Sequence, residues 1–190
     1  MTGREFLDAF ETALRLKDVT RHCYTEGGRR ESVAEHSWSA ALMALMMRDE
    51  FPGVDIDKVV RMCLVHDLGE AFTGDIPSFE KTAEDERAEE KLLAEWVASL
   101  PEAVSAEFKA LYAEMEELKT PEARLYKAID GFEAVIQHNR SDLSTWIEKE
   151  YELNKTYASD RCGDSAFLKE LRAEMRADTE RKIAGGEQAD

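Results

Sequence analysis

Two of the four histidines stand in segments that are otherwise apolar, and one of them is followed directly by a carboxylate. His36 opens the most apolar segment of the chain, and the pair His66-Asp67 follows the apolar residues 62–65. An ionised carboxylate costs several kcal/mol to bury without a partner, so Asp67 needs a compensating charge. A divalent cation would provide it.

Asp130 is a further candidate ligand, and on its own it is a weaker one. It borders an apolar helical stripe, but Glu133 and Gln137 indicate that this flank also carries surface polarity. A single histidine or aspartate of this kind is more often a helix cap or a satisfied polar group in the core. Together, two imidazoles and two carboxylates suit one divalent ion, namely Mn²⁺, Fe²⁺, Co²⁺, Ni²⁺ or Zn²⁺, and Mg²⁺ is less favoured.

Two more acids stand close to His66 in the sequence. Glu70 comes four residues later, so both side chains share one face of a helix. Asp75 belongs to the segment Thr-Gly-Asp-Ile-Pro at 73–77, whose glycine and proline predict a tight turn that aims a carboxylate at a bound ion. A structural metal site needs no such additional acids, and their presence favours a site that performs chemistry.

Other polar residues near these candidates fit structural roles. Glu31 and Glu35 lie next to His36, where they either orient its ring or pair with two neighbouring arginines, and ion pairing is the commoner case. His138 continues the helix that contains Asp130, and we interpret it as structural.

Apolar residues recur at helical spacing along most of the chain, and no convincing β-alternating run is present, so the sequence predicts an all-α bundle. Helices are expected at about 4–17, 35–50, 55–67, 80–99, 101–115 and 121–139, with two more around a turn at Gly163. The first helix has an apolar face for the core, the second is apolar nearly all round as a central buried helix is, and residues 18–34 form a loop. Residues 1–184 are expected to form a single domain and residues 185–190 a frayed tail.

Composition excludes several classes of protein. The 25 Lys and Arg against 41 Asp and Glu give a net charge of −16, which repels nucleic-acid polymers and anionic lipid. The longest apolar run, 40–47, is far shorter than the ~20 residues that span a bilayer, and the first ten residues do not resemble a secretory signal. Three separated cysteines indicate neither a disulfide framework nor a thiolate zinc site. These features predict a reduced, cytoplasmic protein.

The order His36, His66-Asp67, Asp130 resembles the H…HD…D signature of HD-domain metal-dependent phosphohydrolases. The similarity extends to the 5'-deoxynucleotidase branch, which also includes the eukaryotic HD-domain-containing protein 2. It rests on Leu16-Lys17 with Arg21, residues 31–37, His66-Asp67-Leu68-Gly69-Glu70, residues 73–77 with Lys81, and residues 130–137. An HD pair alone is a weak signal, but this ordered set covers roughly residues 10 to 140.

The resemblance implies that His36, His66, Asp67 and Asp130 bind one divalent metal ion in an HD-domain helical bundle. It also implies that Glu70 and Asp75 handle the attacking water or the leaving group. General acid–base chemistry agrees with this implication. Glu70 is then the base or water-orienting group and Asp75 the proton donor, and the two roles are interchangeable at this point.

Substrate contacts follow from the same resemblance. Arg21 would bind the phosphate, and in so acidic a protein Arg21 and Lys81 offset the local repulsion of a phosphate dianion. Bacterial deoxynucleotidases commonly carry a Trp after this arginine, which presses on the sugar and disfavours ribose. Here the residue is His22, which is expected to stack or hydrogen-bond in a similar place, and sugar selectivity stays open.

The predicted function is the release of inorganic phosphate from a nucleoside 5'-monophosphate, with a deoxynucleotide favoured. Two alternatives stay open: an HD enzyme for cyclic nucleotides, nucleoside triphosphates or ppGpp, and a metal-stabilised interaction module without activity. Family precedent favours a homodimer. Apolar residues that fit either its interface or the core are Trp96, Leu100, Trp146 and Tyr151.

Overall fold

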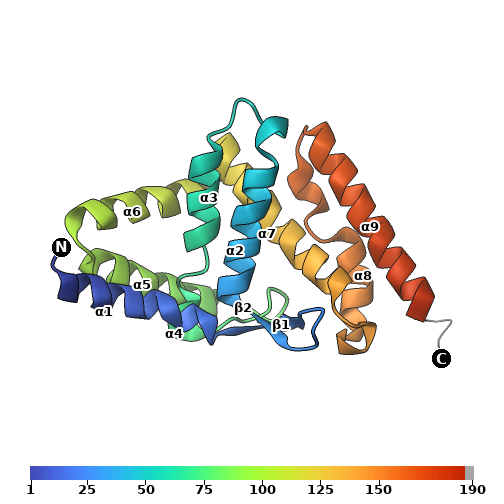
Figure 1. Cartoon of the computed structure of the whole chain (residues 1–190), viewed down its shortest axis with the longest axis horizontal. Helices are drawn as coiled ribbons and strands as arrows, with labels where there is room; N and C mark the ends of the chain where they lie inside the picture. Colours follow the sequence, from blue (N-terminus) through green and yellow to red (C-terminus); the bar gives the residue numbers. More distant parts are fainter. Residues whose placement is uncertain (187–190) are drawn as a thin grey trace.

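The computed structural model describes residues 1–186 and consists mainly of α-helices (Figure 1). The helices are α1 (Gly3–Leu14), α2 (Val33–Met46), α3 (Ile56–Val65), α4 (Glu70–Thr73), α5 (Ala83–Ser99), α6 (Glu102–Glu117), α7 (Pro121–Arg140), α8 (Glu148–Thr156) and α9 (Ala166–Gly186). Short 3₁₀ turns are η1 (Arg15–Lys17), η2 (Arg48–Glu50), η3 (Leu143–Thr145) and η4 (Ser159–Cys162), and the strands are β1 (Thr20–Tyr24) and β2 (Arg30–Ser32). The predicted all-α class is confirmed, with a small hairpin in addition. No helix among the described residues combines the length and apolar character needed to cross a membrane.

Side-chain caps mark where the central helices begin. Ser32, Asp55 and Thr120 each accept a hydrogen bond from the backbone N–H three residues later, at the starts of α2, α3 and α7. The predicted starts of two of these helices, at about 55 and 121, are therefore confirmed. Ser32 and Glu35 form a reciprocal capping box, so α2 begins at Val33, two residues before its predicted start.

Helices α2, α3 and α7 pack against one another at the centre of the molecule (Figure 1). Val59 and Met62 of α3 and Ile129 and Phe132 of α7 are fully buried between them. This packing brings the first turn of α2 to the C-terminal end of α3 and to the middle of α7. The candidate ligands lie at this junction.

Residues 18–34 contain a β-hairpin where the sequence predicted an irregular loop. β1 and β2 pair antiparallel, with Thr20 opposite Ser32 and Tyr24 opposite Arg30, and Gly28 takes a positive φ of 80° in the turn. The loop prediction was wrong because the strands are short and alternate polar rather than apolar residues. The hairpin is what positions Arg21.

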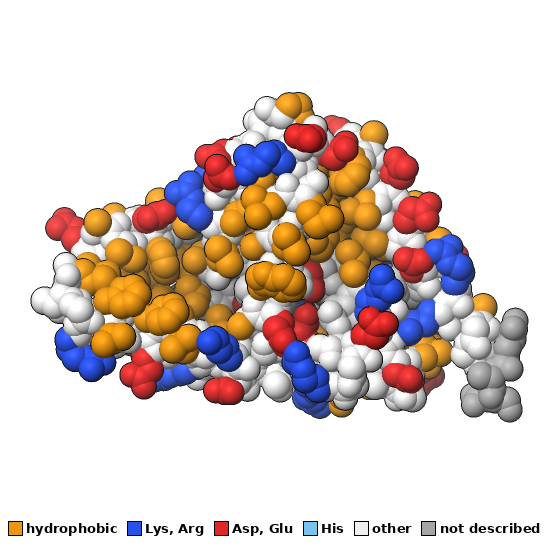
Figure 2. Space-filling model, in the orientation of Figure 1, with side chains coloured by type: hydrophobic (Ala, Val, Ile, Leu, Met, Phe, Trp, Pro, Cys, Tyr) orange, Lys and Arg blue, Asp and Glu red, His pale blue; other side chains and the backbone are white. Residues whose placement is uncertain are grey.

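Two helices expose apolar faces that the sequence assigned to the core. Helix α1 has no buried residue, and Phe6 and Phe10 stack on its outer side. In α2, Trp38 is 62% exposed and Met46 78% exposed. Figure 2 shows apolar side chains gathered over α1 and α2 on one face of the molecule. The predictions of a second helix buried on all sides and of a first helix with its apolar face in the core were wrong. An apolar pattern does not show whether the same chain covers the apolar face.

The C-terminal segments pack on α7 through a close backbone approach. A Cβ on Gly131 would come within 2.6 Å of Ala158 Cβ and of Arg161 Nη1. Glycine at this position therefore allows η4 to pack closely against α7. The predicted turn at Gly163 is confirmed, with a φ of 51°. Trp146 is buried inside the chain. Of the predicted tail 185–190, the first two residues are helical and 187–190 lie outside the described residues.

Candidate metal centre

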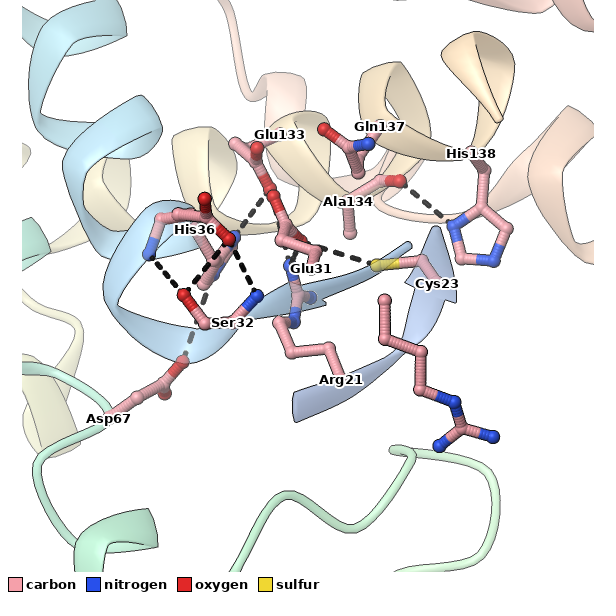
Figure 3. A network of polar contacts seen from close by, with 12 residues as sticks. Arg21, Cys23, Glu31, Ser32, His36, Asp67, Glu133, Ala134, Gln137 and His138 are labelled. Carbon is pink, nitrogen blue, oxygen red and sulfur yellow. Dashed lines mark hydrogen bonds and ion pairs between the residues drawn. The ribbon is translucent and has the colours of Figure 1, made fainter. Parts of the chain in front are cut away.

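His36 and His66 point their Nε2 atoms at each other across 3.2 Å. The other ring nitrogen of each is held by an acceptor. Nδ1 of His66 donates to the Cys63 carbonyl at 2.8 Å, and Nδ1 of His36 donates to the Glu133 carboxylate (Figure 3). Protons on both Nδ1 atoms leave lone pairs on both Nε2 atoms. Two neutral rings would therefore repel each other unless positive charge lies between them.

Two carboxylates complete the primary cluster, the name used below for His36, His66, Asp67 and Asp130. Asp67 Oδ2 lies 3.0 Å from His66 Nε2 and 3.7 Å from His36 Nε2. Asp130 Oδ1 lies 3.3 Å from His36 Nε2 and 3.6 Å from His66 Nε2. The structure thus brings together four side chains from three distant segments of the sequence.

The donor set of the primary cluster fits a divalent cation. An ion with tetrahedral bonds of ~2.0–2.1 Å holds its ligand atoms ~3.3–3.4 Å apart. The separation of the two imidazole nitrogens and those from each carboxylate to the imidazoles, 3.0–3.7 Å, bracket this value. Imidazole nitrogens and carboxylate oxygens together suit first-row ions. His36 is fully buried, whereas the side chains of Asp67 and Asp130 are 23% and 18% exposed, so the cluster is open on its carboxylate side.

The charges of the primary cluster stabilise one another. Burial acts to raise the pKa of Asp67, but the charge and hydrogen bond of His66 outweigh it and lower that pKa to about 2. Burial acts to lower the pKa of His66, but Asp67 and Asp130 outweigh it, so this pKa lies well above its ordinary value. The carboxylates therefore stay ionised, and the imidazoles bind protons more tightly than usual. Both effects show that this site favours positive charge.

Asp130 is held from both sides. Its Oδ1 faces the imidazoles, while its Oδ2 accepts a hydrogen bond from Lys127 at 2.9 Å and lies 3.7 Å from Arg161. Burial acts to raise the pKa of Asp130, but Lys127 and the two histidines outweigh it and bring it well below the ordinary value. Residues of α7 and η4 therefore keep this carboxylate ionised and aimed at the cluster.

Arg21 approaches the primary cluster through a buried network of acids (Figure 3). Its Nη1 donates to Glu31 at 2.8 Å and to Glu133 at 3.3 Å, and the Cys23 thiol also donates to Glu31 at 3.2 Å. Among the described residues, both carboxylate contacts use Nη1, which leaves Nε and Nη2 of the guanidinium for another acceptor. One carboxylate, Glu133, links Arg21 to His36.

Glu133 and Glu31 contact Arg21 at the site, which the sequence did not predict for either residue. Both are buried, and Glu133 orients His36 rather than facing solvent, so its assignment to surface polarity was wrong. The expected surface ion pair is correct for Glu35, which contacts Arg29, but not for Glu31. A signal for Glu133 was available, because it follows Asp130 by three residues and so shares its helical face.

Glu70 and Asp75 lie beside the primary cluster with no ion-pair partner among the described residues. Burial and the neighbouring acids Asp67, Asp75 and Glu89 raise the pKa of Glu70 to about 10. In the part of the chain that the structure describes, its buried Oε2 has no hydrogen-bond partner. Burial also raises the pKa of Asp75, against the positive charge of Arg21. The local acids exceed the local cations, a surplus that a bound cation would offset.

Two predicted substrate contacts make other bonds in the structure. His22 follows Arg21 in β1, so strand alternation turns it to the opposite face, where its Nε2 lies 3.1 Å from Glu150 Oε1. Lys81 donates to Glu89 at 2.8 Å. Their roles in substrate binding stay predictions.

The chain matches a family model described as HD domain over residues 13–171. It is similar to 5'-deoxynucleotidase HDDC2 from Dictyostelium discoideum, with 34% identity over 142 residues that cover 70% of this chain and 75% of that protein.

Solved structures agree with the sequence match. The predicted metal-dependent phosphohydrolase from Magnetospirillum magnetotacticum superposes with a TM-score of 0.76 and 28% identity, covering 96% of both chains. The cyanophage S-2L HD phosphohydrolase DatZ superposes with a TM-score of 0.59 and 26% identity, covering 92% of this chain and 96% of that one. The DatZ structure holds dA and one catalytic Zn²⁺ ion.

Proposed function

This chain belongs to the HD domain family and is an HD phosphohydrolase, and we propose that it releases inorganic phosphate from deoxynucleoside 5'-monophosphates. One observation carries this proposal: the carboxylates of Asp67 and Asp130 each lie 3.0–3.7 Å from both imidazole Nε2 atoms, beside a buried arginine that has donors to spare. Relatives named 5'-deoxynucleotidase and the dA bound to DatZ support the substrate class.

We propose that His36, His66, Asp67 and Asp130 hold one first-row divalent ion. When bound, such an ion supplies Lewis-acid chemistry, since it lowers the pKa of water and withdraws charge from a phosphoryl oxygen. Glu133 and the Cys63 carbonyl fix the ring orientations of the two histidines. Lys127 does the same for Asp130.

Arg21 is the proposed phosphate-binding group. A guanidinium donates to phosphate oxygens in a fixed fork, and Glu31 and Glu133 hold this one by Nη1 alone. The side chain is 12% exposed, so it is positioned before substrate arrives. The surrounding acids would otherwise repel a phosphate dianion, which makes this cation important for capture.

Glu70 and Asp75 are the proposed proton carriers. The oxygen of an attacking water forms the new bond to phosphorus, and Glu70 accepts the proton that this water loses. The bond from phosphorus to the sugar O5' breaks, and Asp75 gives its proton to that oxygen. Glu70 accepts a proton only when it is ionised. This role therefore requires added positive charge near Asp67 that lowers the pKa of Glu70 from about 10.

A phosphate-release screen tests the proposal. The purified chain is stripped with a chelator, reloaded separately with Mn²⁺, Co²⁺, Ni²⁺, Zn²⁺ or Mg²⁺, and assayed against deoxy- and ribonucleoside 5'-monophosphates, triphosphates and cyclic nucleotides. We expect release from deoxynucleoside monophosphates that depends on a first-row ion. Turnover confined to another nucleotide class would reject the substrate assignment, and full activity after chelation would reject the metal.

We further propose that two copies of this chain pair through the exposed apolar faces of α1 and α2 (Figure 2). A contiguous apolar face of this kind on a soluble chain usually marks an interface. Light scattering after gel filtration should give the dimer mass, and W38E, which places a charge in the face, should give the monomer mass. A monomeric unmodified chain would contradict the proposal.

A cytoplasmic location is also proposed. Its support is that Cys23, Cys63 and Cys162 are all free thiols and buried, as is usual in a reducing compartment. Fractionation of cells that express the chain would locate it.

A further inference from the structure

A second group of imidazole and carboxylate side chains lies on the other face of β1. We call His22 of β1, His138 of α7 and Glu150 of α8 the second cluster. Glu150 Oε1 lies 3.1 Å from His22 Nε2 and 3.0 Å from His138 Nε2, and the three donor atoms all lie within 4.8 Å of one another. Two imidazole nitrogens and one carboxylate oxygen form a donor set found in zinc sites.

The remaining polar atoms of two of these residues are already satisfied. His138 Nδ1 donates to the Ala134 carbonyl at 3.0 Å (Figure 3), and Glu150 Oε2 accepts from the Ile147 N–H at 2.8 Å. A neutral His138 that donates through Nδ1 has a lone pair on Nε2, directed at a carboxylate oxygen. This contact is favourable only if His138 carries a second proton or if a cation lies between the two groups.

The second cluster is buried at His138 and Glu150, partly exposed at His22, and adjoins a small cavity. The side chains of His138 and Glu150 are 8% and 5% exposed, and that of His22 is 28% exposed. A cavity of about 40 Å³ lies against all three residues, with Phe79 and Tyr157 among its lining. A water needs ~10–15 Å³ of such volume, so the cavity has room for more than one water beside the three donors. Within residues 1–186, the buried His22 Nδ1 has no hydrogen-bond partner, and a cavity water would satisfy it.

We propose that His22, His138 and Glu150 bind a second divalent metal ion of the zinc class, separate from the ion of the primary cluster. Three protein ligands and one water complete a four-coordinate site. Trp146, which packs against the His138 ring, and Phe79, which packs against the His22 ring, form its apolar shell. The ion joins β1 to α7 and α8.

This position gives the second ion a structural role toward the primary cluster. Successive residues of a strand face opposite sides, so fixing His22 also fixes the backbone that carries Arg21. Helix α7 also holds the backbone of β1 directly, because the Gln137 side-chain amide donates to the Tyr24 carbonyl at 2.7 Å. Metal at the second cluster therefore holds Arg21 in register with Glu133.

Zinc stoichiometry of the untagged full chain tests the proposal. We expect two Zn²⁺ per chain in the unmodified protein, and one in E150Q, in H138N and in H66N/D67N. The amide introduced by E150Q keeps the size of the side chain but is a much poorer ligand than a carboxylate. S78A changes the wall of the same cavity without removing a donor, and it should retain two ions.

A second measurement covers variants that fold poorly. In H66N/D67N, where only the second cluster remains, Zn²⁺ at ~100 times its dissociation constant should raise Tm by ~5–10 °C. Adding E150Q should abolish that rise, and Co²⁺ in H66N/D67N should give visible d–d absorption that disappears with E150Q. One Zn²⁺ in the unmodified chain, or two in both E150Q and H138N, would overturn the proposal. Either result would leave the phosphate-release screen unaffected.

Discussion

The primary cluster and the second cluster use the same kinds of donor in different surroundings. Both combine two imidazoles with carboxylate, and both have a ring whose Nδ1 donates to a backbone carbonyl. The primary cluster, however, is open on one side and stands beside Arg21, Glu70 and Asp75. In the second, an aromatic ring packs on each histidine, and a cavity of about 40 Å³ adjoins the three donors.

This difference distinguishes the ability of a donor set to bind a cation from its ability to support catalysis. Donor type and spacing determine whether a cation fits, and on that measure the two clusters are alike. Chemistry also requires access for a substrate, a cation to capture it and groups that exchange protons. Only the primary cluster has all of these among the described residues, so we assign turnover to it and stability to the other.

The largest effect is expected from D67N. It removes one carboxylate of the primary cluster, and because a bound metal contributes several kcal/mol of transition-state stabilisation, kcat/KM should fall by about 1000-fold or more. The matched change in the second cluster, E150Q, should reduce kcat/KM by about tenfold at most. Phosphate release and metal content are measured for both. Equal losses in the two variants would remove the distinction between the clusters.

A smaller loss is expected from E133Q. Glu133 accepts from both His36 and Arg21, so the change weakens the orientation of a ligand and of the phosphate-binding group. Replacement of such supporting groups typically costs ~10–100-fold in metal affinity or activity. Metal titration should show weaker binding at the primary cluster. E90Q, on the outer side of α5, is the surface control, and a loss no larger than its own would contradict the supporting role.

R21K should act mainly on substrate capture. It keeps the charge that compensates Glu31 and Glu133 but replaces the fork of donors by a point charge, so KM should rise about tenfold with a smaller change in kcat. Steady-state kinetics with a deoxynucleoside monophosphate separate the two constants. An unchanged KM would show that the phosphate is bound elsewhere.

Much of the fold was predictable because the signals are local. Apolar periodicity located the helices, and Asp55, Thr120 and Gly163 marked their boundaries by capping or by a positive φ. The hairpin was missed because β1 is five residues long and its inward side chains, Arg21 and Cys23, are not a core pattern. The exposed apolar faces of α1 and α2 were assigned to the core because sequence does not show what covers a face.

The site was predictable only where a residue contradicts its surroundings. His36 and Asp67 interrupt apolar segments, so each needs an explanation of its own. Glu133 raises no such question by itself, because a carboxylate at the flank of an amphipathic helix is ordinary. Its spacing from Asp130 places both on one helical face, and the packing of the structure shows that it is buried. The second cluster depends on α8 lying against β1, a contact that no local pattern encodes.

A third polar cluster without imidazole provides the smallest expected effect. Lys58 pairs with Glu114 at 2.8 Å and with Glu122 at 3.4 Å, and Glu122 also accepts from the Asp55 N–H at 3.0 Å. E122Q should leave metal content and kcat unchanged and destabilise the chain by about 1 kcal/mol, a fall in Tm of ~2–4 °C.

The effect of E122Q should also depend on pH. Burial acts to raise the pKa of Glu122, but the Asp55 N–H and Lys58 outweigh it, so the folded pKa lies below the ordinary 4.5. A lowered folded pKa contributes stability that is complete above 4.5 and is lost as the pH falls below it. The Tm difference between the unmodified chain and E122Q should therefore be full at pH 7 and shrink toward zero below pH ~4. A difference that persists unchanged in acid would show that packing, and not the ionised carboxylate, stabilises this end of α7.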